Sequence, residues 1–362
     1  MNYLQNLNEE VREYFKILSP EFPEWLLEYI NTKEMQRQGK INISCGTCYS
    51  KLFSSKYWYS NLDHSVGVAL IIWHFTHDKK QTLAGLFHDI ATPCFKHCID
   101  FFNGDSEHQE STEELTEEII RNSEEIMTLL NRDGITLKEV SNYHIYPIAD
   151  NDTPKLSADR FEYTFSCGLV FHRIWELDSI KEMYENISIL KNEYGIDELG
   201  FNDPKLCEKY VHTISKIWPD WIDDKDRATM QFIADTIQSM NIKGYLSIDD
   251  LYILSEEEVL NRIRTCDDEY IRESFKNFEA ATSFYGSDTF VDNKYCTDVK
   301  SKKRYIIPLT KYNDEIYRIN EISSLANQDI EEYLNFKTSK YVGFNFDFKP
   351  YENENKKIFV KK

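Results

Sequence analysis

Residues 61–90 read NLDHSVGVALIIWHFTHDKKQTLAGLFHDI, and this stretch decides the fold class of the chain. From residue 63 to residue 75, apolar side chains such as Leu70 recur near helical spacing, and residues 81–90 form a second short apolar helix. Pro93 is expected to end or bend this second helix, because proline cannot continue the hydrogen bonding of a helix. The pattern predicts a mainly α-helical body.

Helical patterns continue along most of the chain. The segment from Ser111 to Leu130 predicts one amphipathic helix with Ser111 and Glu114 as a capping box, and Ser255 and Glu258 have the same spacing ahead of another. Further helices are predicted at residues 159–171, 178–194, 203–216 and 226–240. Short β-branched or aromatic runs at residues 305–309, 315–319 and 341–348 favour strands. The predicted fold class is therefore mainly α, with a small mixed α/β C-terminal region.

Three parts of the chain are predicted. Residues 1–45 form an N-terminal helical segment, residues 46–240 the main domain, and residues 241–362 a C-terminal helical and β-containing region. The second boundary depends only on Gly244 and the polar turn residues that follow it.

Composition narrows the range of functions. The formal net charge of −20 argues against a protein that coats nucleic acid through phosphate contacts, so nucleic-acid binding is not expected. The longest apolar stretch, residues 66–75, is shorter than a membrane span needs, and the N-terminus lacks the apolar core of a signal peptide. Eight cysteines without a dense framework suit reduced thiols, so the expected location is cytoplasmic.

Four side chains, far apart in the sequence, are candidate metal ligands: His64, His88, Asp89 and Asp159. Imidazole nitrogens and carboxylate oxygens suit a divalent ion, and two of each leave coordination positions for water and substrate. Successive residues of a helix point about 100° apart, so His88 and Asp89 flank one ion only if it lies beside the helix axis. Other helices must supply the opposite ligands.

The blocks around these residues resemble a known family. NLDHSVGVA at residues 61–69, LFHDI at 86–90 and ADRFEY at 158–163 are similar to the three signature blocks of HD-domain metal-dependent phosphohydrolases. The closest resemblance is to the deoxynucleoside triphosphate triphosphohydrolase branch. Residues 88–100, 108–111, 303–309 and 318–322 resemble further segments of that branch, and the likeness covers roughly residues 40 to 325.

The resemblance implies an HD-domain helical fold and a reaction. It implies one divalent metal ion (Mn, Mg, Fe, Ni, Co or Zn) and a metal-activated water that attacks the phosphorus of a nucleotide or related phosphate ester. By family position, His108 would be the general acid or a proton shuttle oriented by Asp100, and His97 would contact a substrate phosphate. Arg160 would donate to an anion and Tyr163 would lie against the sugar or base.

Two positions depart from the branch. Asn61 stands where these enzymes have an arginine three residues before the first histidine, and Thr92 stands where they have a histidine. Both positions would belong to the substrate site. Each lost hydrogen bond to a charged group is typically worth about 1.5 to 3 kcal/mol, so the substrate class stays broad, with a deoxynucleoside triphosphate as its narrowest form.

Two other functions remain open. His108 and His144 lie between Asp89 and Asp159, where binuclear HD proteins place extra ligands, so a binuclear phosphodiesterase or an iron oxygenase is one alternative. A non-catalytic nucleotide-binding sensor is the other. The resemblance also suggests assembly into a homo-oligomer.

Overall fold

The protein is mainly helical. The computed structural model describes residues 3–109, 111 and 115–351. Helices take up 52% of the structure and strands 9%, which confirms the predicted fold class. None of the helices within the described residues is both long and apolar enough to cross a membrane.

Helices dominate the N-terminal half. They are α1 (Tyr3–Asn6), α2 (Glu9–Leu18), α3 (Leu26–Ile30), α4 (Lys33–Gln38), α5 (Asn61–Thr76), α6 (Lys79–Phe87), α7 (Cys98–Asn103), α8 (Thr116–Asn122), α9 (Glu124–Asp133), α10 (Ala158–Val170) and α11 (Leu177–Tyr184). The later helices are α12 (Pro204–Ile214), α13 (Asp224–Ile242), α14 (Asp250–Ile253), α15 (Glu256–Thr265), α16 (Glu269–Ala280), α17 (Ile319–Ile322) and α18 (Ser324–Leu334).

Two small sheets complete the fold. Strands β1 (Ile187–Lys191), β2 (Asp197–Phe201), β5 (Leu309–Tyr312) and β6 (Glu315–Arg318) form a mixed sheet in the order β1-β2-β5-β6, in which only β2 and β5 are parallel. Strands β3 (Tyr285–Ser287), β7 (Tyr341–Phe344) and β4 (Tyr295–Thr297) form an antiparallel sheet in the order β3-β7-β4.

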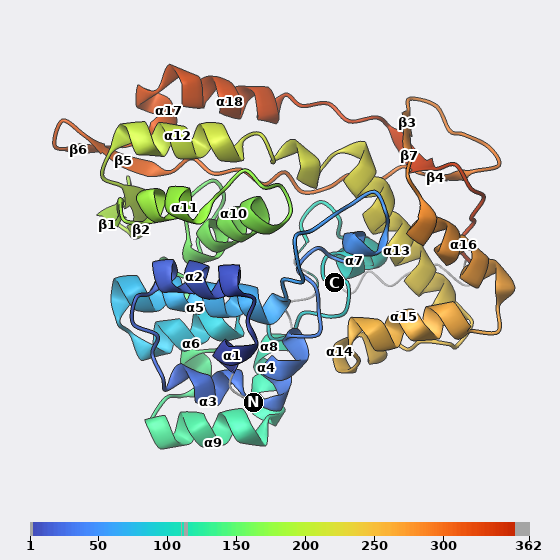
Figure 1. The fold of residues 1–362 in the computed structure, drawn as a ribbon, viewed down its shortest axis with the longest axis horizontal. Coiled ribbons are helices and arrows are strands. Elements are labelled where there is room, and N and C mark those ends of the chain that lie inside the picture. Colours follow the sequence, from blue (N-terminus) through green and yellow to red (C-terminus); the bar gives the residue numbers. More distant parts are fainter. Residues whose placement is uncertain (1–2, 110, 112–114, 352–362) are drawn as a thin grey trace.

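The predicted helical pair is α5 and α6, which pack against each other (Figure 1). Helix α5 begins with a capping box between Ser60 and Asp63, and it is buried continuously from Asn61 to Ile72. Helix α10 crosses α5 at Gly67, where a Cβ atom would lie 2.7 Å from the Cγ of Glu162. Glycine therefore allows the close approach that brings Glu162 against α5.

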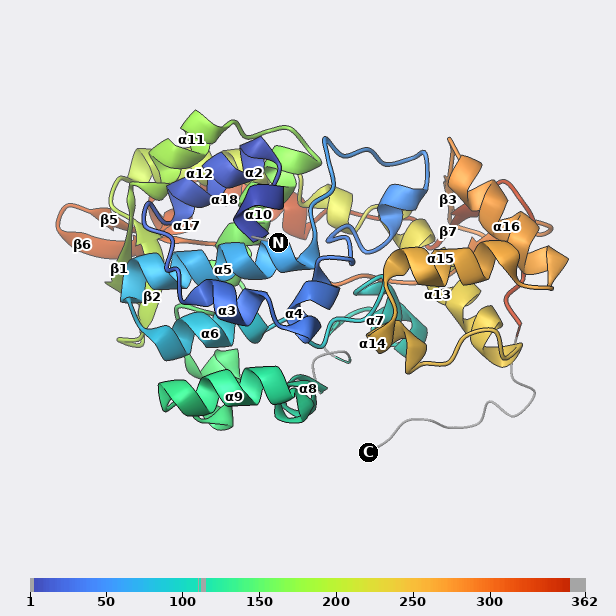
Figure 2. The ribbon, with the colours of Figure 1, turned by 60° about the horizontal axis from the view of Figure 1, so that its bottom comes forward.

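Apolar side chains form two separate cores. The first lies among α2, α5, α6, α10, α11 and α12 and includes α18, and the second lies among α7, α13, α15, α16, β4 and β7. Figures 1 and 2 show the two halves side by side, with the chain after β4 returning to the first half before it joins the second again at β7. The predicted domain boundaries stay predictions; residue 240 lies within α13.

Three predicted elements were wrong. The single helix at 111–130 is two helices, because Ser123 adopts an extended conformation and caps α9 by accepting a hydrogen bond from the Ile126 amide. The proposed capping partner Glu114 lies outside the described residues. The helix at 178–194 ends at Tyr184, and β1 follows because its residues pair with β2 across a turn at Gly195.

The strand predicted at 305–309 was also wrong, since β5 begins only at its last residue, Leu309. The other predicted strands correspond to β6 and to β7, although β7 ends at Phe344. The capping box of Ser255 and Glu258 at the start of α15 is confirmed.

Glu256, the first residue of α15, links the second core to the loop after α6. Its carboxylate is fully buried and accepts hydrogen bonds from the Phe95 amide (3.2 Å) and the Tyr49 hydroxyl (2.6 Å). Burial raises the pKa of Glu256 to about 7. The folded chain therefore holds a proton here that the unfolded chain releases near 4.5.

We expect Glu256→Gln to remove a pH-dependent loss of stability. Between about pH 4.5 and pH 7 the folded chain binds more protons at this position than the unfolded chain, so the free energy of unfolding falls as pH rises. The loss amounts to at most about 3 kcal/mol, and it levels off above pH 7. Urea unfolding of both chains across this window measures the difference. Glu257→Gln, with its side chain 76% exposed, is the control; equal pH profiles for all three chains would contradict the expectation.

Candidate metal centre

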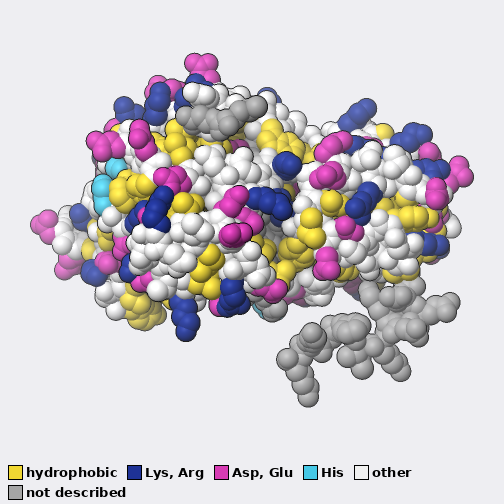
Figure 3. Space-filling model, turned by 90° about the horizontal axis from the view of Figure 1, so that it is seen from below, with side chains coloured by type: hydrophobic (Ala, Val, Ile, Leu, Met, Phe, Trp, Pro, Cys, Tyr) yellow, Lys and Arg dark blue, Asp and Glu magenta, His cyan; other side chains and the backbone are white. Residues whose placement is uncertain are grey.

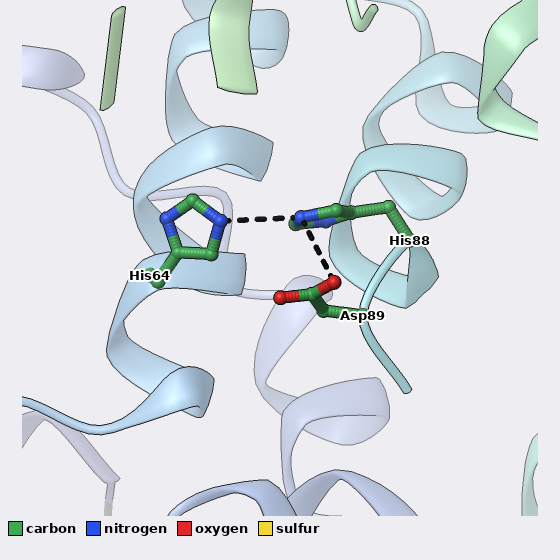
Figure 4. Close-up of side chains that lie close together, drawn as sticks. All are labelled: His64, His88 and Asp89. Carbon is green, nitrogen blue, oxygen red and sulfur yellow. Dashed lines mark hydrogen bonds and ion pairs between the residues drawn. The ribbon is translucent and has the colours of Figure 1, made fainter. Parts of the chain in front are cut away.

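Three helices bring the four predicted ligands together. His64 lies in the first turn of α5, His88 and Asp89 directly follow α6, and Asp159 lies in the first turn of α10. His88 keeps helical backbone angles at the end of α6, so its ring points back towards α5 (Figure 4). The ligands thus come from the ends of helices that are held by one apolar core.

The donor atoms converge. The Nε2 atoms of His64 and His88 lie 3.2 Å apart, and Asp159 Oδ1 lies 3.1 Å from the first and 3.7 Å from the second. Asp89 Oδ1 lies 3.7 Å from His88 Nε2. Figure 4 shows both imidazole rings and the Asp89 carboxylate directed at one point. The predicted gathering of two imidazoles and two carboxylates is therefore present in the structure.

The far sides of both rings are held by acceptors. His88 Nδ1 donates to the carbonyl oxygen of Gly85 (2.7 Å), and His64 Nδ1 contacts the buried carboxylate of Glu162. Tyr59 also donates its hydroxyl to Glu162 (2.6 Å). Acceptors at both Nδ1 atoms turn the Nε2 lone pairs towards the centre, which is how metal-binding histidines are oriented. This donor set fits a divalent ion.

The electrostatics of the cluster also favour a positive charge. Burial lowers the pKa of His64, but the carboxylates of Glu162 and Asp159 outweigh it and raise that pKa to about 10. Burial raises the pKa of Asp89, but Lys96 and the two histidines lower it well below its usual value. Burial also raises the pKa of Asp159, but His64 and His88 outweigh it and lower this pKa below its usual value. Both acids are ionised at neutral pH.

A cavity of about 680 Å³ opens beside these ligands. All four ligands line it. Its other cationic or imidazole side chains are Lys96, His97, His144, Arg160, His172, Lys225, Lys302 and Arg304. Its aromatic walls are Phe53, Tyr143, Tyr163, Phe171 and Trp221. Acidic side chains besides the ligands also line it, namely Asp150, Asp152, Asp220 and Asp226. The cationic and aromatic walls suit a ligand with both an anionic and a planar part.

Three predicted substrate residues line this cavity. His97 Nδ1 donates to Asp100 Oδ2 (2.9 Å), and its Nε2 lies 3.2 Å from an Arg304 nitrogen. Arg160 is paired with Asp150 (2.7 Å), so an anion would compete with this carboxylate for it. The Tyr163 ring packs edge to face against Trp221, with centroids 5.5 Å apart.

Four other predicted residues are not among the cavity walls: Asn61, Thr92, Asp100 and His108. The Asn61 amide is buried and donates to Gln38 (2.9 Å), and Thr92 is also buried. His108, whose side chain is 80% exposed, contacts Asp105 at 3.1 Å. The expected pairing of His108 with Asp100 was wrong, because Asp100 accepts from His97 and from the Ser111 hydroxyl instead.

Sequence reasoning missed three side chains of the candidate site. Glu162 lies three residues after Asp159, and a glutamate on the buried face of an apolar helix was the signal for it. Arg304 ends the basic run Lys302-Lys303-Arg304. It lines the cavity beside His97, which lies 207 residues earlier in the sequence. Lys96 follows the His-Asp pair in an otherwise apolar loop, and it contacts Asp89.

Comparison with known proteins supports the fold and names no activity. No family model matches the sequence. YdhJ of Bacillus subtilis (strain 168), described as an uncharacterized protein, is 22% identical over 285 residues, which cover 76% of this chain and 81% of YdhJ. The crystal structure of a hypothetical protein from Aquifex aeolicus matches with a TM-score of 0.61 and 14% identity, over 89% of this chain and 91% of that chain. The second likeness shows a shared fold.

Proposed function

We propose that this chain is a metal-dependent phosphohydrolase of the HD type that acts on a nucleotide or a related phosphate ester. The observation that carries the proposal is the convergence of His64, His88, Asp89 and Asp159 at the wall of a large cavity that also presents cationic side chains. Within the described residues, the first three form the one group of at least three close potential ligands, which supports a single ion.

The ion would activate the water and the phosphate, and the protein would supply the contacts to the anion. A bound divalent ion would polarise a phosphate oxygen and lower the pKa of a water molecule. The protein supplies the anion contacts: burial lowers the pKa of His97, so this ring is neutral, donates to Asp100 and lies beside the Arg304 guanidinium. Arg304 is thereby held at the cavity wall as a donor for phosphate oxygens.

The remaining walls support a nucleotide as the substrate. A cavity of about 680 Å³ has room for more than a phosphate group. Trp221 and Tyr163 form one aromatic wall, and Phe53 lies under the Lys225 ammonium at 4.6 Å from the ring centre. Planar rings and nearby polar groups are what a nucleobase contacts in proteins. A deoxynucleoside triphosphate is the narrowest form of this proposal.

The face of the molecule that Figure 3 shows gives no support to a large nucleic-acid partner. On the face that Figure 3 shows, the described Lys and Arg side chains alternate with Asp and Glu side chains rather than forming a continuous basic band. A free nucleotide, which needs only the local cations of the cavity, suits this charge pattern better than a duplex does.

A substrate screen tests the proposed function. Nucleoside mono-, di- and triphosphates are incubated with the chain and with Mn²⁺, Mg²⁺, Co²⁺, Ni²⁺, Fe²⁺ or Zn²⁺, and the released product is identified. We expect product only when a divalent metal is present. Release of tripolyphosphate would identify a triphosphohydrolase, and release of phosphate or pyrophosphate a different specificity.

Two outcomes would favour the other functions. Nucleotide-dependent thermal stabilisation or assembly without any product would favour a non-catalytic sensor. Two metal equivalents per chain would favour the binuclear phosphodiesterase or oxygenase. Of the two extra histidines that this alternative needs, His108 does not line the cavity, whereas His144 lines it and lies 3.0 Å from Asp150.

His108→Gln separates the role that the resemblance implies from the role that the geometry favours. A general acid would lose on the order of a hundredfold in turnover when replaced. Because His108 is exposed and pairs with Asp105, we expect turnover within about threefold of that of the unmodified chain. Steady-state kinetics on the substrate found in the screen measures it. A hundredfold loss with unchanged metal content would restore His108 to the mechanism.

A further inference from the structure

Lys96 is an unusual residue for its position. The backbone at Lys96 has a φ of 43°, next to Phe95 with a φ of 65°, and this left-handed region disfavours residues other than glycine. The Lys96 side chain is only 8% exposed, yet the residue lines the cavity. An ammonium group is seldom buried without partners, so the local contacts must account for it.

Those contacts join Lys96 to the candidate metal centre. Its Nζ lies 2.7 Å from Asp89 Oδ2, and it also donates to the side-chain oxygen of Asn61. The other oxygen of the same carboxylate, Oδ1, faces His88 Nε2 at 3.7 Å. Asp89 Oδ1 therefore faces the place of the proposed metal ion, and Asp89 Oδ2 is bound by the Lys96 ammonium group.

This arrangement limits how many ions the centre can hold. A carboxylate commonly bridges two metal ions with one ion on each oxygen, but Asp89 Oδ2 accepts a hydrogen bond from Lys96 instead. A second divalent ion on that side would also lie a few ångströms from a fixed positive charge. Lys96 thus disfavours a second divalent ion on this side of Asp89, and its ammonium group places one positive charge where that ion would lie.

The same ammonium group is placed to contact a ligand. Lysine has three N–H donors, and the described bonds use one on Asp89 and one on Asn61. Lys96 is adjacent in sequence to His97, which lies beside Arg304, so positive or donor groups follow one another along this wall. An oxygen of a phosphate bound at the centre would meet the ion on one side and this wall on the other.

Building on the proposed function, we propose that Lys96 is the second cation of a one-metal centre. Its ammonium group holds Asp89, keeps the centre at one divalent ion, and donates to the phosphate group that this ion binds. The side-chain oxygen of Asn61 accepts a hydrogen bond from the ammonium and orients it.

The test compares Lys96→Met with the unmodified chain in two measurements. Calorimetric titration with Mn²⁺ gives stoichiometry and affinity, and turnover is measured at saturating metal. We expect one equivalent in the unmodified chain. In Lys96→Met we expect Mn²⁺ to bind at least about tenfold more tightly, because a like charge on the shared carboxylate is gone. Turnover is expected to fall by about a hundredfold, as when one stabilising donor is removed.

If Lys96 had only a structural role, its replacement would lower both the Mn²⁺ affinity and the turnover. Lys225→Met is the matched control, since Lys225 lines the same cavity but contacts Phe53 rather than a ligand, and its Mn²⁺ affinity should change by less than about threefold. Lys96→Gln repeats the comparison if the methionine chain does not fold, as judged by circular dichroism.

Three results would overturn the proposal: two Mn²⁺ equivalents in the unmodified chain, weaker Mn²⁺ binding in a folded Lys96 variant, or unchanged turnover in that variant. Failure of the proposed function is distinguishable. If the unmodified chain turns over no substrate, that function fails, while the Mn²⁺ stoichiometry and the direction of the affinity change still decide the placement of Lys96.

Discussion

Asp89→Ala is expected to abolish divalent-metal binding and the proposed phosphohydrolase turnover while the chain stays folded. Asp89 contributes one of the two carboxylates at the centre, and it is also the partner of the Lys96 ammonium. Its removal leaves an unpaired positive charge beside the three remaining ligands, so a divalent ion meets repulsion as well as a missing ligand. We expect a lower melting temperature for the same reason, with helix content retained because α5 and α6 pack through apolar side chains.

Metal analysis after dialysis, turnover and circular dichroism measure the three parts of this expectation. Asp152→Ala is the matched control: Asp152 lines the same cavity, but its side chain is 96% exposed and it is not one of the converging ligands. That chain should keep its metal and most of its turnover. Full activity in Asp89→Ala would reject the assignment of the metal centre.

Glu162→Gln is expected to weaken metal binding by about 10- to 100-fold, the range typical of residues that orient metal-binding histidines. Glu162 is fully buried, contacts His64 Nδ1 and accepts from the hydroxyl groups of Tyr59 (2.6 Å) and Ser166 (3.2 Å). Glutamine keeps the size but loses the charge, and its amide would point N–H groups at atoms that donate. His64 then has less electron density to offer an ion.

Saturating metal should recover much of the turnover of Glu162→Gln, because the ligand itself is unchanged. Glu198→Gln is the control, since Glu198 is also fully buried and pairs with Arg318 (2.5 Å) away from the cavity. It should lose stability with no change in metal affinity. If Glu162→Gln bound Mn²⁺ as tightly as the unmodified chain, Glu162 would have no orienting role.

Local signals in the sequence predicted the helices well where apolar spacing and capping residues agreed. The start of α15 is the example, because the capping box of Ser255 with Glu258 acts within one turn of chain and precedes an apolar run. The β1-β2 hairpin was missed, since Ile187–Lys191 becomes a strand only by pairing with residues six to fourteen positions away.

The same distinction applies to the candidate site. The sequence by itself determined the candidate ligands and their order, His64, His88-Asp89 and Asp159, because this choice depends on chemistry that single residues and short motifs display. Only the tertiary structure decided which side chains surround them. It paired Asp100 with His97 rather than His108, set Lys96 on Asp89, and brought Arg304 to the cavity. Contacts between distant segments depend on how helices pack and on which buried charges find partners, and neither is written in the spacing along the chain.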